Sequence, residues 1–354
     1  MMTHIESLQQ LMQENTCAII DSEVNRRYFT GMKSSAGTLL VFKDAAYFII
    51  DFRYIEKARK TVKTCEVILQ GRLYAQISEL IKRHGSPTLM IDSSVCTVEQ
   101  LAVLSKRLDT QIASDDTLSR LISSLRIVKS HEELDKMIEA QRIAEAGLSH
   151  MFDFVEAGRT EKEIQLELDY YMLSHGAEAL SFDTIALSGA NTSLPHGVPS
   201  DKKVEKGDLV LLDFGAVVDG WHSDMTRTFC VGEPTDEMRK VYDIVLKAQL
   251  AGIDAVKAGI SGKELDAVSR KIIADNGYGG YFGHSLGHGV GMEIHESPYA
   301  SPSVADIINE GAVVTVEPGI YLEGKFGVRI EDFVIVTSDG CINMTEAPKE
   351  LICL

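Results

Sequence analysis

A chain of 354 residues, 45% hydrophobic and 25% charged, has room for two domains that each bury a core. Its 52 acidic and 35 basic residues give a net charge of −17, which excludes nucleic acid and anionic membranes as expected partners, because phosphate binding needs positive charge. No apolar run could span a membrane, the N-terminus does not read as a signal peptide, and the six cysteines form no CxxC pair, so we expect a cytoplasmic protein.

The first third of the chain alternates between helical and strand-like segments. Apolar residues at helical spacing predict a surface helix over residues 4–15. Strands are expected at CAIID, GTLLVF and AAYFIID, followed by a helix from about Tyr54, a helix at RLYAQISELIKRHG closed by Gly85, and a strand at TLMID. This alternation indicates an α/β domain of about 120 residues.

The stretch SSLRIVKSHEELDKM marks the expected junction with the rest of the chain. Ser130 can cap a helix there, and Glu133 three residues later completes a capping box. The His131-Glu132 pair does not indicate a zinc site, because HEELD lacks the second histidine of HExxH.

The remaining two-thirds contains two similar segments, an internal echo that suggests a repeat. The segment EAGRTEKEI from Glu156 matches KAGISGKEL from Lys257, and in each a long helix ends, the chain turns at Ala-Gly, and a second helix is capped by Thr160 or Ser261. Both second helices lead into β regions that carry glycine and histidine, SFDTIALSGANTSLPHG and GYFGHSLGHGVGMEIHE. Chance similarity at capping positions is one explanation. A duplicated α/β unit with a pseudo-twofold axis explains more.

Residues 207–231, GDLVLLDFGAVVDGWHSDMTRTFCV, are predicted to form a hairpin. Asp219-Gly220 is the dipeptide that most favours a type I′ turn, and this turn places Asp213 opposite Thr226. Asp224 then lies on the same face, one diagonal step from Asp213. Two acids therefore converge among apolar residues, where a lone carboxylate costs several kcal/mol unless a cation meets it.

The segment VVTVEPGIYLEGKFGVRIEDFVIV is predicted to form a second pair of strands around a turn at Gly324. Glu317 and Glu331 would then lie nearly opposite each other, which is unfavourable for like charges. Together with Asp213, Asp224 and a histidine from GHSLGHGVGMEIHE, these acids indicate a metal site. An oxygen-rich set with one imidazole suits a pair of Mn²⁺, Co²⁺, Fe²⁺ or Zn²⁺ ions.

The ordered series Asp213, Asp224, His288, Glu317 and Glu331, with DFG, HGVG, VEPG and RIED around it, resembles the pita-bread metallopeptidases. These include Xaa-Pro aminopeptidases, Xaa-Pro dipeptidases and methionine aminopeptidases. The resemblance covers residue 125 to the C-terminus, while residues 1–124 resemble the smaller domain that precedes the catalytic one in the Xaa-Pro enzymes and in creatinase. It implies a mixed α/β (α+β) fold: an N-terminal creatinase-like α/β domain (1–124) followed by a pseudo-twofold pita-bread catalytic domain (125–354).

The resemblance also implies roles for individual residues. Two divalent ions per chain, with Mn²⁺ the first choice, would be bridged by Asp224 and Glu331. Asp213 would bind one ion, and His288 and Glu317 the other. Glu317 would also take a proton from the attacking water. Further catalytic or substrate-binding positions are His196, which would contact the scissile amide or its leaving nitrogen, His295, which would steady the oxyanion, His284, Tyr299 and Arg329. Arg329 shares a face with Glu331 and would brace the acidic cluster and orient the substrate.

The activity implied is hydrolysis of the bond before proline in a small peptide, as an Xaa-Pro aminopeptidase, with Xaa-Pro dipeptidase as the alternative. Dipeptidase members commonly carry an arginine after HExP, where HESPY here has Tyr299, so we expect peptides longer than a dipeptide to be preferred. A metal-free creatinase-like hydrolase and a non-catalytic binding protein on the same fold are more remote alternatives. Dinucleotide binding is not indicated, because the sequence has no GxGxxG followed by a helix. Because the N-terminal domain of such enzymes often packs against a partner subunit, the resemblance also implies a homodimer.

Overall fold

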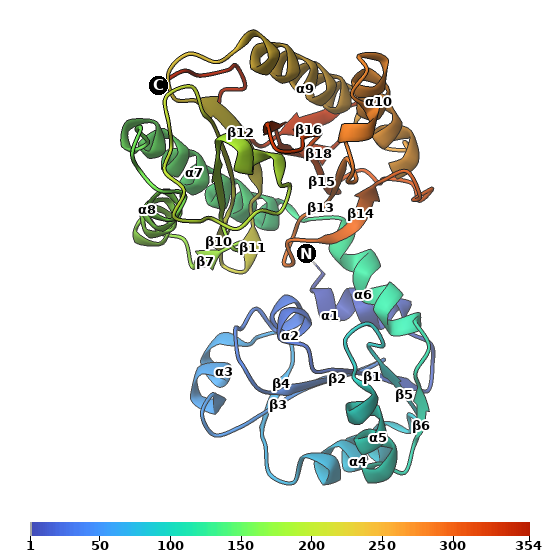
Figure 1. Cartoon of the computed structure of the whole chain (residues 1–354). Coiled ribbons are helices and arrows are strands. Elements are labelled where there is room, and N and C mark those ends of the chain that lie inside the picture. The colour runs from blue at the N-terminus through green and yellow to red at the C-terminus, as the bar shows by residue number, and fades with distance from the viewer. Residues whose placement is uncertain (1) are drawn as a thin grey trace. The chain divides into compact units, whose positions relative to one another are not determined.

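The computed structural model describes residues 2–354, which divide into one compact unit ending at Arg126 and a second spanning Ile127–Leu354 (Figure 1). The first unit is built on a six-stranded mixed sheet in the order β4-β3-β2-β1-β5-β6. Its strands are β1 (Thr16–Ile20), β2 (Thr38–Phe42), β3 (Ala46–Ile50), β4 (Glu66–Leu69), β5 (Thr88–Ile91) and β6 (Gln111–Ala113). Its helices are α1 (His4–Leu11), α2 (Glu23–Thr30), α3 (Ile55–Thr61), α4 (Leu73–His84) and α5 (Val98–Arg107), and α6 (Thr117–Ile127) leads out of it.

The helices and strands predicted for this unit are confirmed, and others were missed. The helix predicted over residues 4–15 ends earlier, at Leu11, and α4 ends as expected at Gly85, which adopts a left-handed φ of 59°. The helix α2 escaped prediction because its buried side includes Asn25 and Arg26, which interrupt the apolar period.

The second unit contains two long helices, each followed by a shorter one, and several small sheets. Its helices are α7 (His131–Phe154), α8 (Glu161–Ser174), α9 (Asp236–Ala255) and α10 (Gly262–Asp275), with 3₁₀ turns at Gly189–Ser193 and Gly279–Tyr281. Its strands are β7 (Ala179–Leu180), β8 (Ile185–Ser188), β9 (Leu209–Phe214), β10 (Ala216–Val218), β11 (Trp221–His222), β12 (Met225–Cys230), β13 (Gly287–Gly289), β14 (Glu296–Ala300), β15 (Val313–Val316), β16 (Gly319–Leu322), β17 (Phe326–Arg329), β18 (Asp332–Val336) and β19 (Cys341–Asn343). The sheets have the orders β11-β10-β7, β12-β9-β8, β14-β13-β15-β18-β19 and β16-β17.

The internal echo corresponds to a structural repeat. The hydroxyl of Thr160 accepts the first-turn N–H of Glu163 in α8, and that of Ser261 accepts the N–H of Glu264 in α10, so both form capping boxes. The predicted capping box of Ser130 and Glu133 is likewise present at the start of α7. Each half therefore contains a long helix, a turn and a capped second helix, as the sequence predicted.

The first hairpin has the predicted register. Asp219 and Gly220 have φ of 49° and 86°, as a type I′ turn requires, and Asp213 pairs with Thr226. The hairpin is not one continuous pair, however, because β9 and β12 lie in one sheet and β10 and β11 in another. The break falls at Gly215, where a Cβ would lie 2.0 Å from the carbonyl oxygen of Ser223. Only glycine allows the two strands this close approach.

The second hairpin is divided in the same way. Val316 pairs with Asp332 and Gly319 with Arg329, so one register runs through both pairs and sets Glu317 opposite Glu331, as predicted. The prediction of a single pair of strands was wrong: β15 and β18 form one pair, and β16 and β17 another. Pro318 has no N–H to donate to a ladder, which helps to end β15 at Val316.

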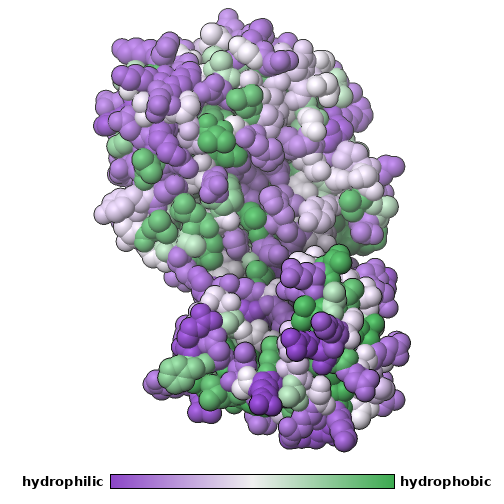
Figure 2. Space-filling model, turned by 60° about the horizontal axis from the view of Figure 1, so that its bottom comes forward, coloured by the Kyte–Doolittle hydropathy of each residue, from purple (hydrophilic) through white to green (hydrophobic). Residues whose placement is uncertain are grey.

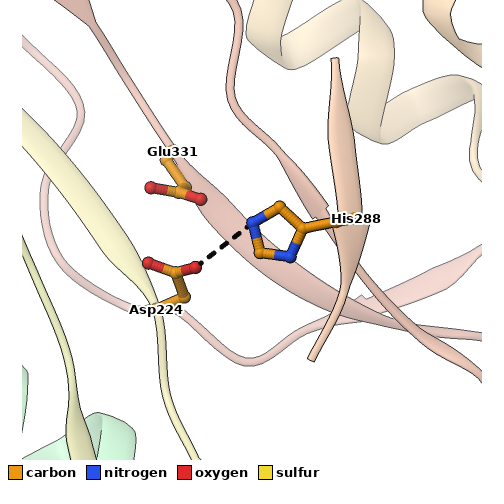
Figure 3. Close-up of side chains that lie close together, drawn as sticks. All are labelled: Asp224, His288 and Glu331. Atoms are coloured by element: carbon orange, nitrogen blue, oxygen red, sulfur yellow. Dashed lines mark ion pairs between the residues drawn. The ribbon is translucent and has the colours of Figure 1, made fainter. Parts of the chain in front are cut away.

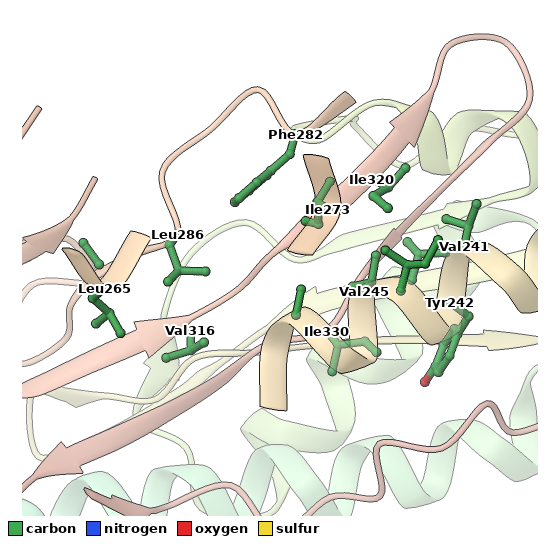
Figure 4. Close-up of a cluster of buried hydrophobic side chains, with 14 of the residues drawn as sticks. Val241, Tyr242, Val245, Leu265, Ile273, Phe282, Leu286, Val316, Ile320 and Ile330 are labelled. Carbon is green, nitrogen blue, oxygen red and sulfur yellow. The ribbon is translucent and has the colours of Figure 1, made fainter. Parts of the chain in front are cut away.

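Each half of the second unit has its own apolar core. In one, α7 and α8 pack with β9 and β12; in the other, α9 and α10 pack with the C-terminal strands. Figure 4 shows the second core, where Val245 of α9 and Leu265 of α10 lie among strand residues that include Val316 of β15 and Ile320 of β16. Burying a side chain of this kind contributes roughly 1.5–3 kcal/mol. Hydrophilic residues cover most of the face drawn in Figure 2, and within residues 2–354 no helix combines the length and apolarity of a membrane span.

Candidate metal centre and its cavity

Every residue predicted to belong to the site lines one cavity of about 750 Å³ in the second unit. The first half contributes Asp213 from β9, Asp224 from the residues just before β12, and His196 from the loop after the 3₁₀ turn. The other predicted residues, which come from the second half, are His284, His288, His295, Tyr299, Glu317, Arg329 and Glu331. The duplicated hairpins thus bring distant parts of the sequence to one cavity.

Asp224, His288 and Glu331, which form the centre of the candidate metal site, point toward one another (Figure 3), and their donor atoms lie within 4.8 Å of one another. The Nε2 atom of His288 lies 3.6 Å from Oδ2 of Asp224 and 3.3 Å from Oε1 of Glu317. The Nδ1 atom of His288 is 3.1 Å from the carbonyl oxygen of Gly289, which can only accept, so Nδ1 carries the proton. Nε2 therefore turns its lone pair toward carboxylate oxygens.

Burial raises the pKa of three carboxyl groups in this cluster. The pKa of Glu317 rises to about 8, chiefly through burial. The pKa values of Asp224 and Glu331 are raised for the same first reason, followed by repulsion from Asp213 for Asp224 and from Asp224 for Glu331. Burial also lowers the pKa of His288 to about 4, so its imidazole is neutral. Two carboxylates 4 Å apart repel by roughly 4 kcal/mol at an effective dielectric near 20.

These residues fit a pair of divalent cations. The buried Oδ1 atom of Asp213 has no hydrogen-bond partner within the described chain, and a bare oxygen of this kind suits a metal ligand. A cation between Nε2 of His288 and the facing carboxylates would turn an unfavourable meeting of lone pair and anions into coordination. The donor set, all oxygen apart from one imidazole nitrogen, is consistent with the ions expected from the sequence.

Arg329 lies inside the acidic cluster. Its side chain is 3% exposed, and its Nη2 donates to Oδ2 of Asp213 at 2.5 Å. Its other nitrogens donate to the hydroxyls of Thr226 and Tyr321 and to the carbonyl oxygen of Pro195. Each of the three guanidinium nitrogens therefore donates to the protein, and this arrangement holds Asp213 in place.

The remaining histidines surround the centre. The ring of His295 packs against that of His288 with centroids 4.3 Å apart. The Nδ1 atom of His284 is hydrogen-bonded to the carbonyl oxygen of Ser285, and its Nε2 atom to the hydroxyl of Tyr321. Burial lowers the pKa of His284 to about 4. His196 is exposed in its loop, near enough to His284 and His295 to lower their pKa values electrostatically. Tyr299 is 40% exposed and pairs across the strands with His288.

Sequence reasoning missed three hydroxyls that support the cluster. Thr226 donates to Oε2 of Glu331 at 2.7 Å, and Thr315 donates to Oε1 of Glu317 at 3.1 Å. The third is Tyr321, which links Arg329 to His284. The predicted registers could have identified them, because Thr226 faces Asp213, Thr315 lies two residues before Glu317, and Tyr321 is diagonal to Arg329.

A duplicated fold with a carboxylate-rich donor set in one cavity indicates a metal-dependent enzyme. Comparison with known proteins is more specific. The sequence profile of metallopeptidase family M24 matches residues 135–338, and that of the creatinase/prolidase N-terminal domain matches residues 4–128. The chain therefore belongs to metallopeptidase family M24, and the family and fold class expected from the sequence are confirmed.

Individual relatives are similar along their whole length. The chain is 37% identical to the Xaa-Pro dipeptidase of Pyrococcus furiosus over 99% of its own length and 100% of that protein. The structure of an Xaa-Pro dipeptidase from Bacillus anthracis matches with a TM-score of 0.95 and 41% identity over 99% of both chains. That of an X-Pro aminopeptidase from Thermotoga maritima matches with a TM-score of 0.92 and 35% identity, covering 98% of this chain and 99% of that one.

Proposed function

We propose that this protein is a dinuclear metallopeptidase that hydrolyses the bond before proline, with Xaa-Pro dipeptides as substrates. The observation that carries the proposal is the convergence of Asp213, Asp224, His288, Glu317 and Glu331 on one cavity. The dipeptidases named above, at 37% and 41% identity, support the dipeptide in place of the longer peptide expected from the sequence.

The residues divide the work as follows. Asp213, Asp224, His288, Glu317 and Glu331 would hold the two ions, with Asp224 and Glu331 contacting both, Asp213 one of them, and His288 and Glu317 the other. When bound, such ions polarise the scissile carbonyl and lower the pKa of a shared water. Glu317 accepts the proton of the attacking water, His295 hydrogen-bonds to the oxyanion, and His196 contacts the leaving nitrogen of proline. Arg329 keeps Asp213 oriented through the direct ion pair.

Xaa-Pro aminopeptidase is the second candidate, and Tyr299 favours it. A tyrosine offers a dipeptide carboxylate one neutral hydrogen bond where an arginine would offer a charged, bidentate pair. The similarity to the Thermotoga maritima aminopeptidase is consistent with this candidate.

Kinetics on Ala-Pro and Ala-Pro-Ala, measured side by side with Mn²⁺, decide between the candidates. A higher kcat/KM for Ala-Pro supports the dipeptidase, and a clear preference for Ala-Pro-Ala supports the aminopeptidase. Efficient cleavage of Met-Ala-Ser together with no cleavage of either proline peptide would overturn both. Glu317→Gln should lower kcat by about 10²- to 10⁴-fold, and an unchanged kcat with two ions still bound would remove its role as the base.

We further propose a cytoplasmic homodimer that uses Mn²⁺. The six cysteines are all free thiols, which supports a reducing compartment. Size-exclusion chromatography with light scattering tests the dimer, and elemental analysis of protein purified without added metal tests the ion.

A further inference from the structure

The cavity poses an electrostatic problem for a short peptide. A peptide with a free C-terminus brings a carboxylate into a cavity that already holds Asp213, Asp224, Glu317 and Glu331. Two divalent ions would balance those four charges, and the other charged side chains that line the cavity are Asp183, which would repel a carboxylate, and the cations Arg329 and Lys162. A carboxylate entering without a cation of its own would meet only neutral hydrogen bonds.

Two side chains of permanent positive charge line the cavity within the described chain, Arg329 and Lys162. Arg329 is excluded as a substrate partner because it is 3% exposed and every one of its nitrogens is bound by the protein. Lys162 is different. It is exposed, and its ammonium donates to the neutral amide oxygen of Gln165 at 2.8 Å. Its charge also acts at longer range on the carboxyl of Asp169, whose Oδ1 accepts a hydrogen bond from the hydroxyl of Thr184 at 2.5 Å.

The backbone of Lys162 is held in place by the start of its helix and by a neighbouring loop. It is the second residue of α8, and its backbone N–H donates to the carbonyl oxygen of Ser200 at 3.1 Å. Glu161 beside it is fully buried and accepts hydrogen bonds from Ser188, Asn191 and Ser200. This network ties the start of α8 to the loop that carries His196. The side chain of Lys162 can therefore move while its anchor stays fixed beside the cavity.

We propose that Lys162 binds the free C-terminal carboxylate of short Xaa-Pro substrates. This inference rests on the proposed peptidase function and adds the residue that selects for a free C-terminus. Exchanging Gln165 for a carboxylate replaces a neutral partner with a charged one, which makes the interaction favourable. It also supplies the cation that is absent at Tyr299.

The test compares Lys162→Met with wild type on four peptides: Ala-Pro, Ala-Pro-amide, Ala-Pro-Ala and Ala-Pro-Ala-amide. We expect Lys162→Met to lower kcat/KM about tenfold for a free acid, mainly through KM, and to leave the matching amide within about twofold. The peptide length at which Lys162→Met lowers kcat/KM for the acid but not for the amide identifies the substrate whose carboxylate reaches Lys162. Lys162→Arg should keep the preference for the acid.

Lys203→Met is the matched control, because Lys203 is exposed near the same helix but does not line the cavity. Circular dichroism melting of all variants checks the fold. Equal losses for acid and amide at both lengths, or no loss at either, would overturn the role of Lys162 while leaving the peptidase intact. Wild-type protein that cleaves none of the four peptides would overturn the proposed function, and the role of Lys162 with it.

Discussion

Metal-free protein should become less stable as the pH rises from 5 to 8, and Glu317 should be a main cause. Its pKa is about 8 in the folded chain, against an ordinary value of 4.5. The folded chain therefore keeps a proton that the unfolded chain has lost. The stability from this proton is fully present below pH 4.5 and is lost as the pH rises through about 8.

The size of the effect follows from the same two values. A pKa of about 8 against 4.5 corresponds to at most about 5 kcal/mol of free energy of unfolding once titration is complete. Glu317→Gln replaces the titrating group with a neutral amide of the same shape. The variant should match wild type at pH 5 and exceed its free energy of unfolding by several kcal/mol at pH 8.

Urea denaturation of EDTA-treated wild type and Glu317→Gln, at half-unit steps from pH 5 to 8, measures this difference. Glu323→Gln serves as a control, because Glu323 is exposed in the turn beside Gly324. Adding Mn²⁺ at pH 8 should raise the free energy of unfolding of wild type more than that of Glu317→Gln, because the variant has lost a metal ligand. A constant difference between the two proteins across the pH range would refute the electrostatic reasoning.

Other perturbations have equally definite outcomes. Elemental analysis should find about two divalent ions per chain, and Asp224→Asn should lose metal and activity together; full activity in verified metal-free protein would contradict the metal assignment. In metal-free protein, Arg329→Met should lower the free energy of unfolding by roughly 3–5 kcal/mol in urea, because it leaves the Asp213 carboxylate without its cation, and a change under 1 kcal/mol would argue against the pair. Thr160→Ala and Ser261→Ala should each lower the free energy of unfolding by about 1 kcal/mol, and the two losses should add in the double variant because the residues cap helices in different halves. A double variant no less stable than the single ones would contradict this.

The sequence was most informative where a local signal fixes geometry. Asp219-Gly220 sets a two-residue turn, and the turn sets the register that places Asp213 opposite Thr226. Helix caps could be predicted equally well, because the hydroxyl of Ser261 and the carboxylate of Glu264 bond to backbone groups within the same turn. In these places the information lies within a few residues of the structure that it determines.

Prediction was weaker where distant contacts decide. In α2, Asn25 is buried because it donates to Asp92, and Arg26 because it donates to the carbonyl oxygen of Ser34. No apolar period remains to mark that helix. The breaks in the hairpins were missed for a similar reason, since the need for glycine at 215 comes from the carbonyl oxygen of Ser223 on the opposing strand. Partners of this kind are known only once the fold is known.

The two breaks explain how one site can draw on both halves. Asp224 lies where the first hairpin changes sheets, and Glu317 and Glu331 lie where the second does. At such a break an acid leaves its own ladder, and a bridge between Thr226 and Glu331 joins the halves directly. Neither half alone assembles the donor set, so the acids converge only in the folded unit. Ions that bind only this state should stabilise it by about 2.7 kcal/mol at a hundredfold excess over Kd, which couples metal loading to folding of the catalytic unit.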